Sequence, residues 1–295
     1  MKCSEHVNGK SNVYGIIGNP IEHSFSPVLQ NTLAQMIGHN NIYVPFKVEK
    51  DNLKKVAEGG YALGIKGFNV TVPHKKDIMN VIFDTDKNAQ IIGAVNTLKY
   101  TEKGYVGYNT DIIGLGKCFE VKGIDIKNKN VVVLGAGGAA NAAVVLAATE
   151  GAKTIYIINR TIPTAENLKS HILKYYNVDI EVMGYDQIIN IENPEIVIQT
   201  TSLGMGDTAG NSPIKERNFF KKVKAVVDII YSPWETKFLE DARSMGCIAI
   251  NGFDMLVYQG IASYEIWNDI KIDNLHAEKI KNNLANYYLS TKNKV

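Results

Sequence analysis

The chain has few of the features that mark secreted, metal-dependent or membrane-bound proteins. Its 295 residues include three cysteines, Cys3, Cys118 and Cys247, which are far apart and lack metal-ligand spacing. This predicts free thiols in a reducing compartment, and neither disulfides nor a metal site. No apolar run approaches the roughly 20 residues of a membrane-spanning helix, and the polar N-terminus lacks the apolar segment of a signal peptide. We therefore expect a cytoplasmic protein that does not contact membranes.

An excess of charge is also missing. Lys and Arg number 32 and Asp and Glu number 30, without a run of like charges. The chain therefore lacks a basic surface of the kind that binds nucleic acids or membranes, and we expect a small-molecule partner. A length of 295 residues with 45% hydrophobic residues exceeds the usual size of one compact core, which predicts two domains.

Short apolar strands alternate with helices along the chain. In the first half we expect strands at residues 13–18, 42–46, 66–71 and 104–108, and helices at 27–37, 51–59, from Pro73 onward and after Asp111. In the second half we expect strands at 131–134, 154–158, 179–183, 195–199, 224–229 and 247–250, and helices at about 138–150 and 163–175. Two helices, one through Trp267 and one at about 274–289, then follow without strands between them.

This order predicts an α/β fold. Strict alternation favours mostly parallel sheets covered by helices, and the second half has the pattern of a Rossmann-type, doubly wound dinucleotide-binding domain. We predict a substrate-binding and catalytic domain at residues 11–111 plus 252–295 and a cofactor-binding domain at 112–251. The C-terminal helices are expected to return to the first domain.

A strand that runs into a glycine-rich turn, VVVLGAGGAA at residues 131–140, predicts where the cofactor binds. Gly135 permits the tight turn, Gly137 lets the backbone approach a pyrophosphate, and the helix N-terminus offers N–H groups to the anion. The expected contacts are Gly135, Ala136, Gly137, Gly138 and Ala139. A purely structural turn is the alternative.

The end of the next strand bears on the choice of cofactor. An acidic residue there would bind the ribose of NAD, whereas an arginine would pair with the 2′-phosphate of NADP. The sequence is Asn159-Arg160-Thr161, without an acid. Arg160 can pair with phosphate, and Asn159 and Thr161 can add hydrogen bonds. This favours NADP, although an ordinary surface arginine is the alternative.

Two polar segments of the first half predict the chemistry. NVTVPHK at residues 69–75 and NTD at 109–111 offer hydroxyls, amides, an ammonium and a carboxylate, which can hold a small polyhydroxylated acid and move a proton on it. Lys75 lies in the first turn of the helix expected from Pro73, where the helix dipole disfavours a cation. A solvated Lys75 and an N-capping Asp111 are the structural alternatives. With the glycine-rich turn, these segments indicate a pyridine-nucleotide dehydrogenase.

These residues also carry a resemblance to the shikimate dehydrogenase family, which extends from Gly15 to the last helix. GNPIEHSFSP at 18–27 resembles the family's opening loop, whose serines, Ser24 and Ser26, would hold the substrate carboxylate. Residues 69–75 resemble the segment with the catalytic lysine, Lys75. GAVNT at 93–97 and NTD at 109–111 are similar to the segments that bind the ring hydroxyls and supply the catalytic aspartate, Asp111.

The resemblance continues through the cofactor half. Residues 135–140 and 159–161 are similar to the pyrophosphate and adenosine-phosphate segments, and TSLGM at 201–205 resembles the loop beside the nicotinamide ribose. DIIYSP at 228–233 carries Tyr231, which the family places near the substrate carboxylate. In the closing segment at 251–259, one helix face would present Met255 to nicotinamide and Gln259 to substrate. The implied cofactor contacts beyond those above are Thr201, Ser202, Met205, Ile229, Gly252 and Met255.

The resemblance implies an NADP-dependent enzyme that reversibly reduces 3-dehydroshikimate to shikimate, on the path to chorismate and the aromatic amino acids. Lys75 would be the general acid and base, and Asp111 would orient it. The implied substrate contacts are Ser24, Ser26, Asn69, Thr71, Lys75, Asn96, Asp111, Tyr231 and Gln259. Either a monomer or a homodimer is compatible with the resemblance.

One departure concerns the cofactor. NADP-using members usually carry a second basic residue where this chain has Thr164, which leaves use of NAD, or of both cofactors, open. An enzyme that also acts on quinate with NAD is therefore the alternative. A non-catalytic sensor of nucleotide and metabolite is a remote alternative, which loss of Lys75 or Asp111 would have indicated.

Overall fold

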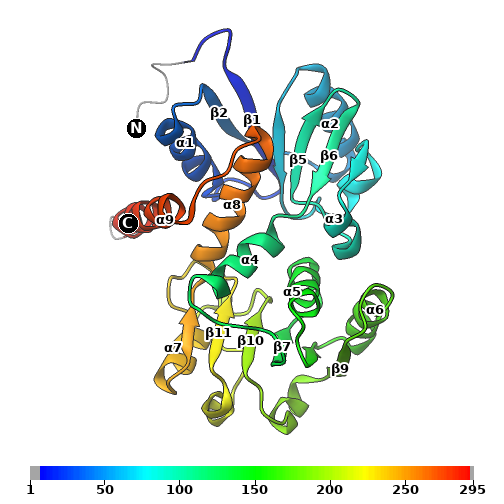
Figure 1. The fold of residues 1–295 in the computed structure, drawn as a ribbon, viewed down its shortest axis with the longest axis vertical. Helices are drawn as coiled ribbons and strands as arrows, with labels where there is room; N and C mark the ends of the chain where they lie inside the picture. The colour runs from blue at the N-terminus through cyan, green and yellow to red at the C-terminus, as the bar shows by residue number, and fades with distance from the viewer. Residues whose placement is uncertain (1–6, 293–295) are drawn as a thin grey trace. The chain divides into compact units, whose positions relative to one another are not determined.

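The computed structural model describes residues 7–292, so Cys3 lies outside the described residues, while Cys118 and Cys247 are free and buried. The chain divides into two compact units (Figure 1). Unit 1 comprises Met1–Ile113 and Val257–Val295, and unit 2 comprises Gly114–Leu256. None of the helices within residues 7–292 combines the length and the apolarity needed to cross a membrane.

Unit 1 is built on a six-stranded sheet in the order β2-β1-β3-β5-β6-β4. The strands are β1 (Asn12–Gly18), β2 (Asn41–Lys47), β3 (Gly67–Val70), β4 (Asp84–Thr85), β5 (Thr97–Thr101) and β6 (Gly104–Tyr108). β1 pairs in parallel with β2 and β3, and β4 with β6, whereas β5 runs antiparallel to β3 and β6. The predicted mostly parallel sheet is confirmed, but the hairpin formed by β5 and β6 was not predicted.

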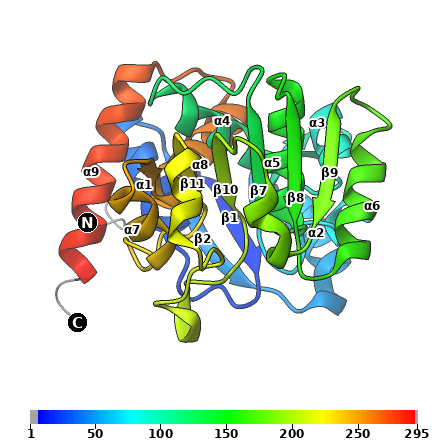
Figure 2. The same ribbon diagram turned by 90° about the horizontal axis from the view of Figure 1, so that it is seen from below.

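The helices of unit 1 pack on this sheet and on each other. They are α1 (Ser26–Ile37), α2 (Leu53–Ala62) after a short 3₁₀ turn (Lys50–Asn52), α3 (Lys87–Ile92), most of α8 (Gly252–Asn268) and α9 (Asn274–Lys292). The indole N–H of Trp267 on α8 donates to the Leu98 carbonyl of β5 at 2.8 Å. Phe25 meets Tyr288 of α9 edge to face, and α9 lies beside α1 (Figures 1 and 2). The C-terminal helices therefore return to the first unit, as predicted.

The prediction of a helix from Pro73 onward is wrong. Residues 72–76 form turns, and only a short 3₁₀ helix, η3 (Asp77–Asn80), follows. An α-helix would need the Lys75 carbonyl to accept from the N–H four residues later, but this carbonyl accepts from Val95 N–H at 2.8 Å. Because Lys75 is not in the first turn of a helix, the helix-dipole argument does not apply to it.

Unit 2 has a six-stranded, fully parallel sheet in the order β12-β11-β10-β7-β8-β9. Its strands are β7 (Asn130–Leu134), β8 (Thr154–Ile158), β9 (Asp179–Met183), β10 (Ile196–Gln199), β11 (Ala225–Asp228) and β12 (Ile248–Ile250). Its helices are α4 (Asp111–Glu120), which begins in unit 1, α5 (Gly138–Thr149), α6 (Ile162–Ile172) and α7 (Lys237–Ser244), with 3₁₀ turns at Tyr185–Asn190, Gly206–Thr208 and Arg217–Lys222.

The strand order confirms the predicted Rossmann-type fold. The chain proceeds from β7 outward through β8 to β9, then returns to β10 beside β7 and continues to β11 and β12 (Figure 2). This reversal places a switch point between β7 and β10, where such folds bind their ligands outside the carboxyl ends of the strands. The four central strands are apolar and buried, as expected for a parallel sheet covered on both faces.

Candidate active site

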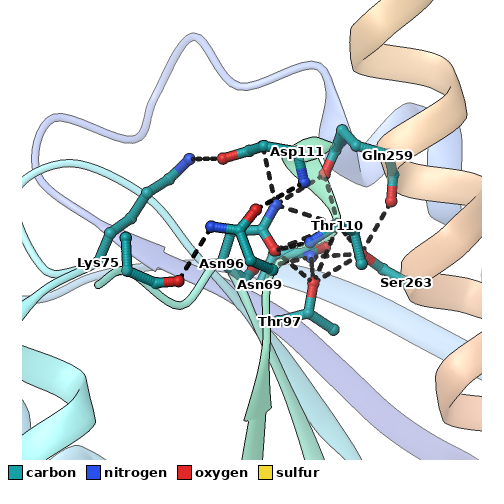
Figure 3. Close-up of polar contacts among 10 residues, drawn as sticks. Asn69, Lys75, Asn96, Thr97, Thr110, Asp111, Gln259 and Ser263 are labelled. Atoms are coloured by element: carbon teal, nitrogen blue, oxygen red, sulfur yellow. Dashed lines mark hydrogen bonds and ion pairs between the residues drawn. The ribbon is translucent and has the colours of Figure 1, made fainter. Parts of the chain in front are cut away.

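A lysine and an aspartate that are 36 residues apart in sequence form one end of a polar cluster in unit 1 (Figure 3). Lys75 Nζ lies 2.6 Å from Asp111 Oδ2, and Asp111 Oδ1 accepts from Asn96 Nδ2 at 2.8 Å. The side chains of Lys75 and Asp111 are 27% and 12% exposed. The pair is therefore largely shielded, although part of the lysine side chain is exposed.

The local fold explains why these residues meet. Lys75 lies in the turns after β3, Asn96 directly precedes β5, and Asp111 begins α4 just after β6. Because β3, β5 and β6 are neighbours in the sheet, the segments at their ends converge. The side chain of Asn109 accepts from Asp111 N–H at 3.0 Å, while the carboxylate of Asp111 is directed to Lys75 and Asn96.

The other predicted substrate residues of unit 1 lie around the same sheet. Asn69, on β3, accepts from Tyr43 OH at 2.8 Å and donates to Ser263 Oγ at 3.0 Å. Gln259 Oε1 lies 3.4 Å from Thr110 Oγ1 and 3.5 Å from Asn96 Nδ2.

The opening loop begins against the end of β3. A Cβ on Gly18, the last residue of β1, would lie 2.4 Å from Thr71 Cγ2. A larger residue than glycine would therefore push these segments apart. Ser24 and Ser26 follow in this loop, where Ser26 N–H donates to Ser24 Oγ at 3.3 Å. Ser26 is buried and Ser24 is partly exposed.

In unit 2 the predicted cofactor residues gather at one edge of the sheet. Segments 135–139, 159–161, 201–205 and 229 follow β7, β8, β10 and β11, which are adjacent parallel strands. Their carboxyl ends therefore meet at the same edge. A Cβ on Gly252 would lie 2.2 Å from the Ile229 carbonyl oxygen, so the first turn of α8, which carries Met255, starts in contact with this edge.

The glycine-rich turn is tight at its first glycine and open at the next two. Gly135 has φ +110°, and a Cβ there would lie 2.7 Å from Thr200 Oγ1, so the turn needs glycine. A Cβ on Gly137 or Gly138 would meet no heavy atom within 4 Å. The backbone at the N-terminus of α5 therefore faces open space, in which an anion can reach the N–H groups of this helix.

The residues predicted to choose the cofactor are accessible. Arg160, Thr161 and Thr164 are exposed, and Asn159 Nδ2 donates to the Thr161 carbonyl at 2.9 Å, which fixes the turn before α6. Burial raises the pKa of the Tyr185 phenol, and the charge of Arg160 acts in the opposite direction. The guanidinium therefore lies near the segment that follows β9.

Comparison with known proteins supplies the family. Residues 16–98 match the shikimate dehydrogenase substrate binding domain, and residues 117–229 match shikimate/quinate 5-dehydrogenase. A shikimate dehydrogenase (NADP(+)) from Methanococcus aeolicus is 41% identical over 267 residues, which are 90% of this chain and 95% of that protein. The chain belongs to the shikimate dehydrogenase family.

Solved structures of shikimate dehydrogenases are similar throughout. One, in complex with NADP+, is 39% identical, with a TM-score of 0.88 and coverage of 95% of this chain and 97% of that one. The enzyme of Listeria monocytogenes, in complex with shikimate and NAD, is 30% identical, with a TM-score of 0.89 and coverage of 95% and 99%.

Sequence reasoning missed several residues that hold the predicted site residues in place. Tyr43 and Ser263 both contact Asn69, and Thr97 donates to Asn96 Oδ1 at 3.0 Å. The spacing of four between Gln259 and Ser263 on one helix was a usable signal, because such residues share a face. In unit 2, the buried Gln199 accepts from Thr201 N–H at 2.9 Å and donates to the Leu203 carbonyl at 3.0 Å, which fixes the loop at 201–205.

Asp228 is a further residue for which the sequence predicted no role. It ends β11 and is fully buried, accepting from Ile230 N–H at 3.0 Å and from Thr236 Oγ1 at 2.6 Å. Burial raises the pKa of the carboxyl from 3.8 to about 6, although both hydrogen bonds act in the opposite direction. Asp228 thereby fixes the loop that contains Ile229 and Tyr231, but a charge is costly there.

We expect the contribution of Asp228 to the free energy of unfolding to fall as the pH rises from about 4 to about 6. The folded chain binds the Asp228 proton more tightly than the unfolded chain, so the stabilisation is complete below the unfolded pKa and is lost through the folded pKa. A shift from 3.8 to about 6 corresponds to about 3 kcal/mol. The measurement is urea unfolding of the wild type and of Asp228→Asn at pH 4 and pH 7. Between these two pH values, the free energy of unfolding of the variant should rise by this amount relative to that of the wild type. Exposed Asp207→Asn is the control, and a parallel pH dependence of wild type and Asp228→Asn would contradict the expectation.

Proposed function

We propose that this chain is an NADP-dependent shikimate dehydrogenase that reversibly reduces 3-dehydroshikimate to shikimate, on the path to chorismate and the aromatic amino acids. The observation that carries the proposal is the contact of 2.6 Å between Lys75 Nζ and Asp111 Oδ2, with Asn96 on the second carboxylate oxygen. This arrangement holds an ammonium at a fixed place beside polar groups that suit ring hydroxyls. The catalytic groups that a non-catalytic sensor would have lost are present.

Lys75 is the proposed proton donor. NADPH, when bound, supplies the hydride that reduces the ring carbonyl. As the carbonyl oxygen gains negative charge, the ammonium of Lys75 stabilises it and transfers a proton to it. In the reverse direction the neutral amine of Lys75 takes the proton from the hydroxyl. Asp111 keeps Lys75 in place and accepts a hydrogen bond from a ring hydroxyl, and Asn69, Asn96 and Gln259 bind the remaining hydroxyls.

Hydroxyl groups bind the carboxylate end of the substrate in this proposal. Ser24, Ser26, Thr71 and Tyr231 are the proposed donors, and several aligned hydrogen bonds to a carboxylate are stronger than neutral pairs. Support comes from the position of Thr71 against Gly18 at the end of β1, and from Ser24 and Ser26 in the segment that follows β1 in unit 1. Tyr231 belongs to unit 2, and its role rests on the resemblance of segment 228–233.

The carboxyl edge of the unit 2 sheet is the proposed NADP site. The N–H groups at the N-terminus of α5 and segment 135–139 would hold the pyrophosphate, and Asn159, Arg160 and Thr161 would hold the adenosine 2′-phosphate. Thr201, Ser202, Met205, Ile229, Gly252 and Met255 would surround the nicotinamide and its ribose. The relatives named for NADP(+) support this choice of cofactor.

The decisive measurement is the rate of shikimate oxidation with NADP+ and with NAD+, with quinate as a parallel substrate. We expect kcat/KM to be highest for shikimate with NADP+. Comparable rates with NAD+ would favour the alternative of dual cofactor use; the relative from Listeria monocytogenes was solved with shikimate and NAD. Comparable rates with quinate would favour an enzyme that acts on both acids. Absence of activity with all four combinations would contradict the proposed function.

Location and assembly remain predictions from the sequence. We propose a cytoplasmic enzyme, because free cysteines are typical of reducing compartments, and either a monomer or a homodimer. Size-exclusion chromatography with light scattering would decide the assembly.

A further inference from the structure

A buried layer of hydroxyl groups lies beneath the proposed catalytic pair (Figure 3). Thr97, Thr110 and Ser263 are all fully buried. Thr97 Oγ1 lies 2.8 Å from Ser263 Oγ and 3.3 Å from Thr110 Oγ1, and Thr110 Oγ1 lies 3.1 Å from Ser263 Oγ. The three hydroxyls thus contact one another, although they come from β5, the residue before α4, and α8.

The orientation of the Asn96 amide links this layer to the catalytic pair. The backbone N–H of Thr110, which can only donate, lies 2.7 Å from Asn96 Oδ1, so this atom is the oxygen. The amide nitrogen must then face Asp111 Oδ1, at 2.8 Å. Asp111 in turn holds Lys75 through its other oxygen. A rotation of the Asn96 amide would remove the donor from Asp111 and free the carboxylate to turn away from Lys75.

Each hydroxyl of the layer has an acceptor for its proton within hydrogen-bond distance. Ser263 Oγ donates to the Gln259 carbonyl at 3.0 Å, because a carbonyl can only accept. Ser263 Oγ and Asn96 Oδ1 are then acceptors for the other two hydroxyls, and Gln259 Oε1 is a further acceptor for Thr110, at 3.4 Å. Thr97 Oγ1 lies 2.8 Å from Ser263 Oγ and 3.0 Å from Asn96 Oδ1. Thr110 Oγ1 lies 3.1 Å from Ser263 Oγ and 3.2 Å from Asn96 Oδ1. Asn96 Oδ1 also accepts from Thr110 N–H, and Ser263 Oγ also accepts from Asn69 Nδ2. Removal of the Thr97 hydroxyl therefore takes one of several donors from these acceptors and weakens the hold on the Asn96 amide.

We propose that Thr97, Thr110 and Ser263 form a positioning layer that holds the Asn96 amide, and through it Asp111 and Lys75, in the arrangement needed for proton transfer. Thr97 is its central member, because its hydroxyl contacts both asparagine side chains: it donates to Asn96 Oδ1 at 3.0 Å and accepts from Asn69 Nδ2 at 3.1 Å. None of the three need touch substrate; they act through the two asparagines. The expected loss of activity rests on the proposed function. The expected loss of order at Asn96 rests on the hydrogen bonds alone.

The test is Thr97→Val, which keeps the shape of the side chain and removes the hydroxyl. We expect kcat for shikimate oxidation to fall roughly tenfold with a change in KM below about threefold, because small misplacements of reacting groups lower the rate strongly. The pH profile of kcat should also shift, and hydrogen exchange of the Asn96 side-chain amide, followed by NMR, should accelerate. Thr97→Ser should restore all three readouts.

The matched control is Thr32→Val, which removes a buried hydroxyl from α1 in the same unit. Thermal unfolding of both valine variants separates loss of fold from loss of positioning. Unchanged exchange of the Asn96 amide in folded Thr97→Val, or an equal loss of kcat in Thr32→Val, would overturn the proposal. If the wild type lacks shikimate activity, the proposed function fails, but the exchange measurement still decides whether Thr97 positions Asn96.

Discussion

Replacing Lys75 with alanine is expected to lower kcat for shikimate oxidation by about 10²- to 10⁴-fold, with little change in substrate affinity. The physical reason is that Lys75 is the group proposed to exchange a proton with the reacting oxygen. Its ammonium also stabilises the negative charge that develops there. Both effects operate mainly in the transition state, so their loss appears in kcat and to a lesser extent in KM. Steady-state rates in both directions provide the measurement.

Lys76→Ala is the matched control for this variant. Lys76 is the neighbouring residue and is exposed, so its replacement changes the net charge equally without touching the pair. Circular dichroism and thermal unfolding should show that Lys75→Ala folds, because the side chain lies in turns and not within a helix or strand. Near wild-type turnover in Lys75→Ala would show that another group supplies the proton. An equal loss in Lys76→Ala would attribute the effect to charge and not to the pair.

The parts of the fold that could be predicted are those with a local signal. β7, α5 and β8 each follow from an apolar run, a glycine-rich turn and the spacing between them. The hairpin β5–β6 was missed because its second strand, Gly104–Tyr108, was recognised without its partner. Strand pairing is decided by contacts between segments, which sequence periodicity does not encode. The turns at 72–76 were mistaken for a helix because Pro73 suits a first helical turn, while the competing Val95 N–H lies 20 residues away in sequence.

The site shows the same division between local and distant information. The glycine-rich turn could be assigned from its own residues, since each glycine has a steric reason within a short segment. The pairing of Lys75 with Asp111 could not, because their proximity depends on the order β3-β5-β6 within the sheet. Resemblance to a family supplied that pairing in advance. It did not supply Thr97 or Ser263 as supports, because a buried hydroxyl leaves no distinctive pattern in the sequence.

Replacing Arg160 with alanine is expected to raise the Kd for NADP+ by roughly 10- to 100-fold, the range for loss of charge-assisted hydrogen bonds. The Kd for NAD+, which lacks the 2′-phosphate, should change little. Arg160 is exposed at the end of β8 and beside the first turn of α6, so its loss removes a ligand contact without opening the core. Calorimetric titration of each cofactor into wild type and variant gives the ratio directly, and NAD+ is the internal control.

Thr164→Arg provides the complementary test. Thr164 is an exposed residue of α6, and its N–H donates to the Thr161 carbonyl at 3.1 Å, so it lies one helical turn from the proposed phosphate position. A guanidinium there should tighten NADP+ and leave NAD+ unchanged, because only one of the two ligands offers it a phosphate. If Arg160→Ala weakened both cofactors equally, the arginine would be contacting the adenine or ribose that they share. The choice of NADP would then depend on other residues of this edge, and the absence of an acid at Asn159 would be the remaining argument for it.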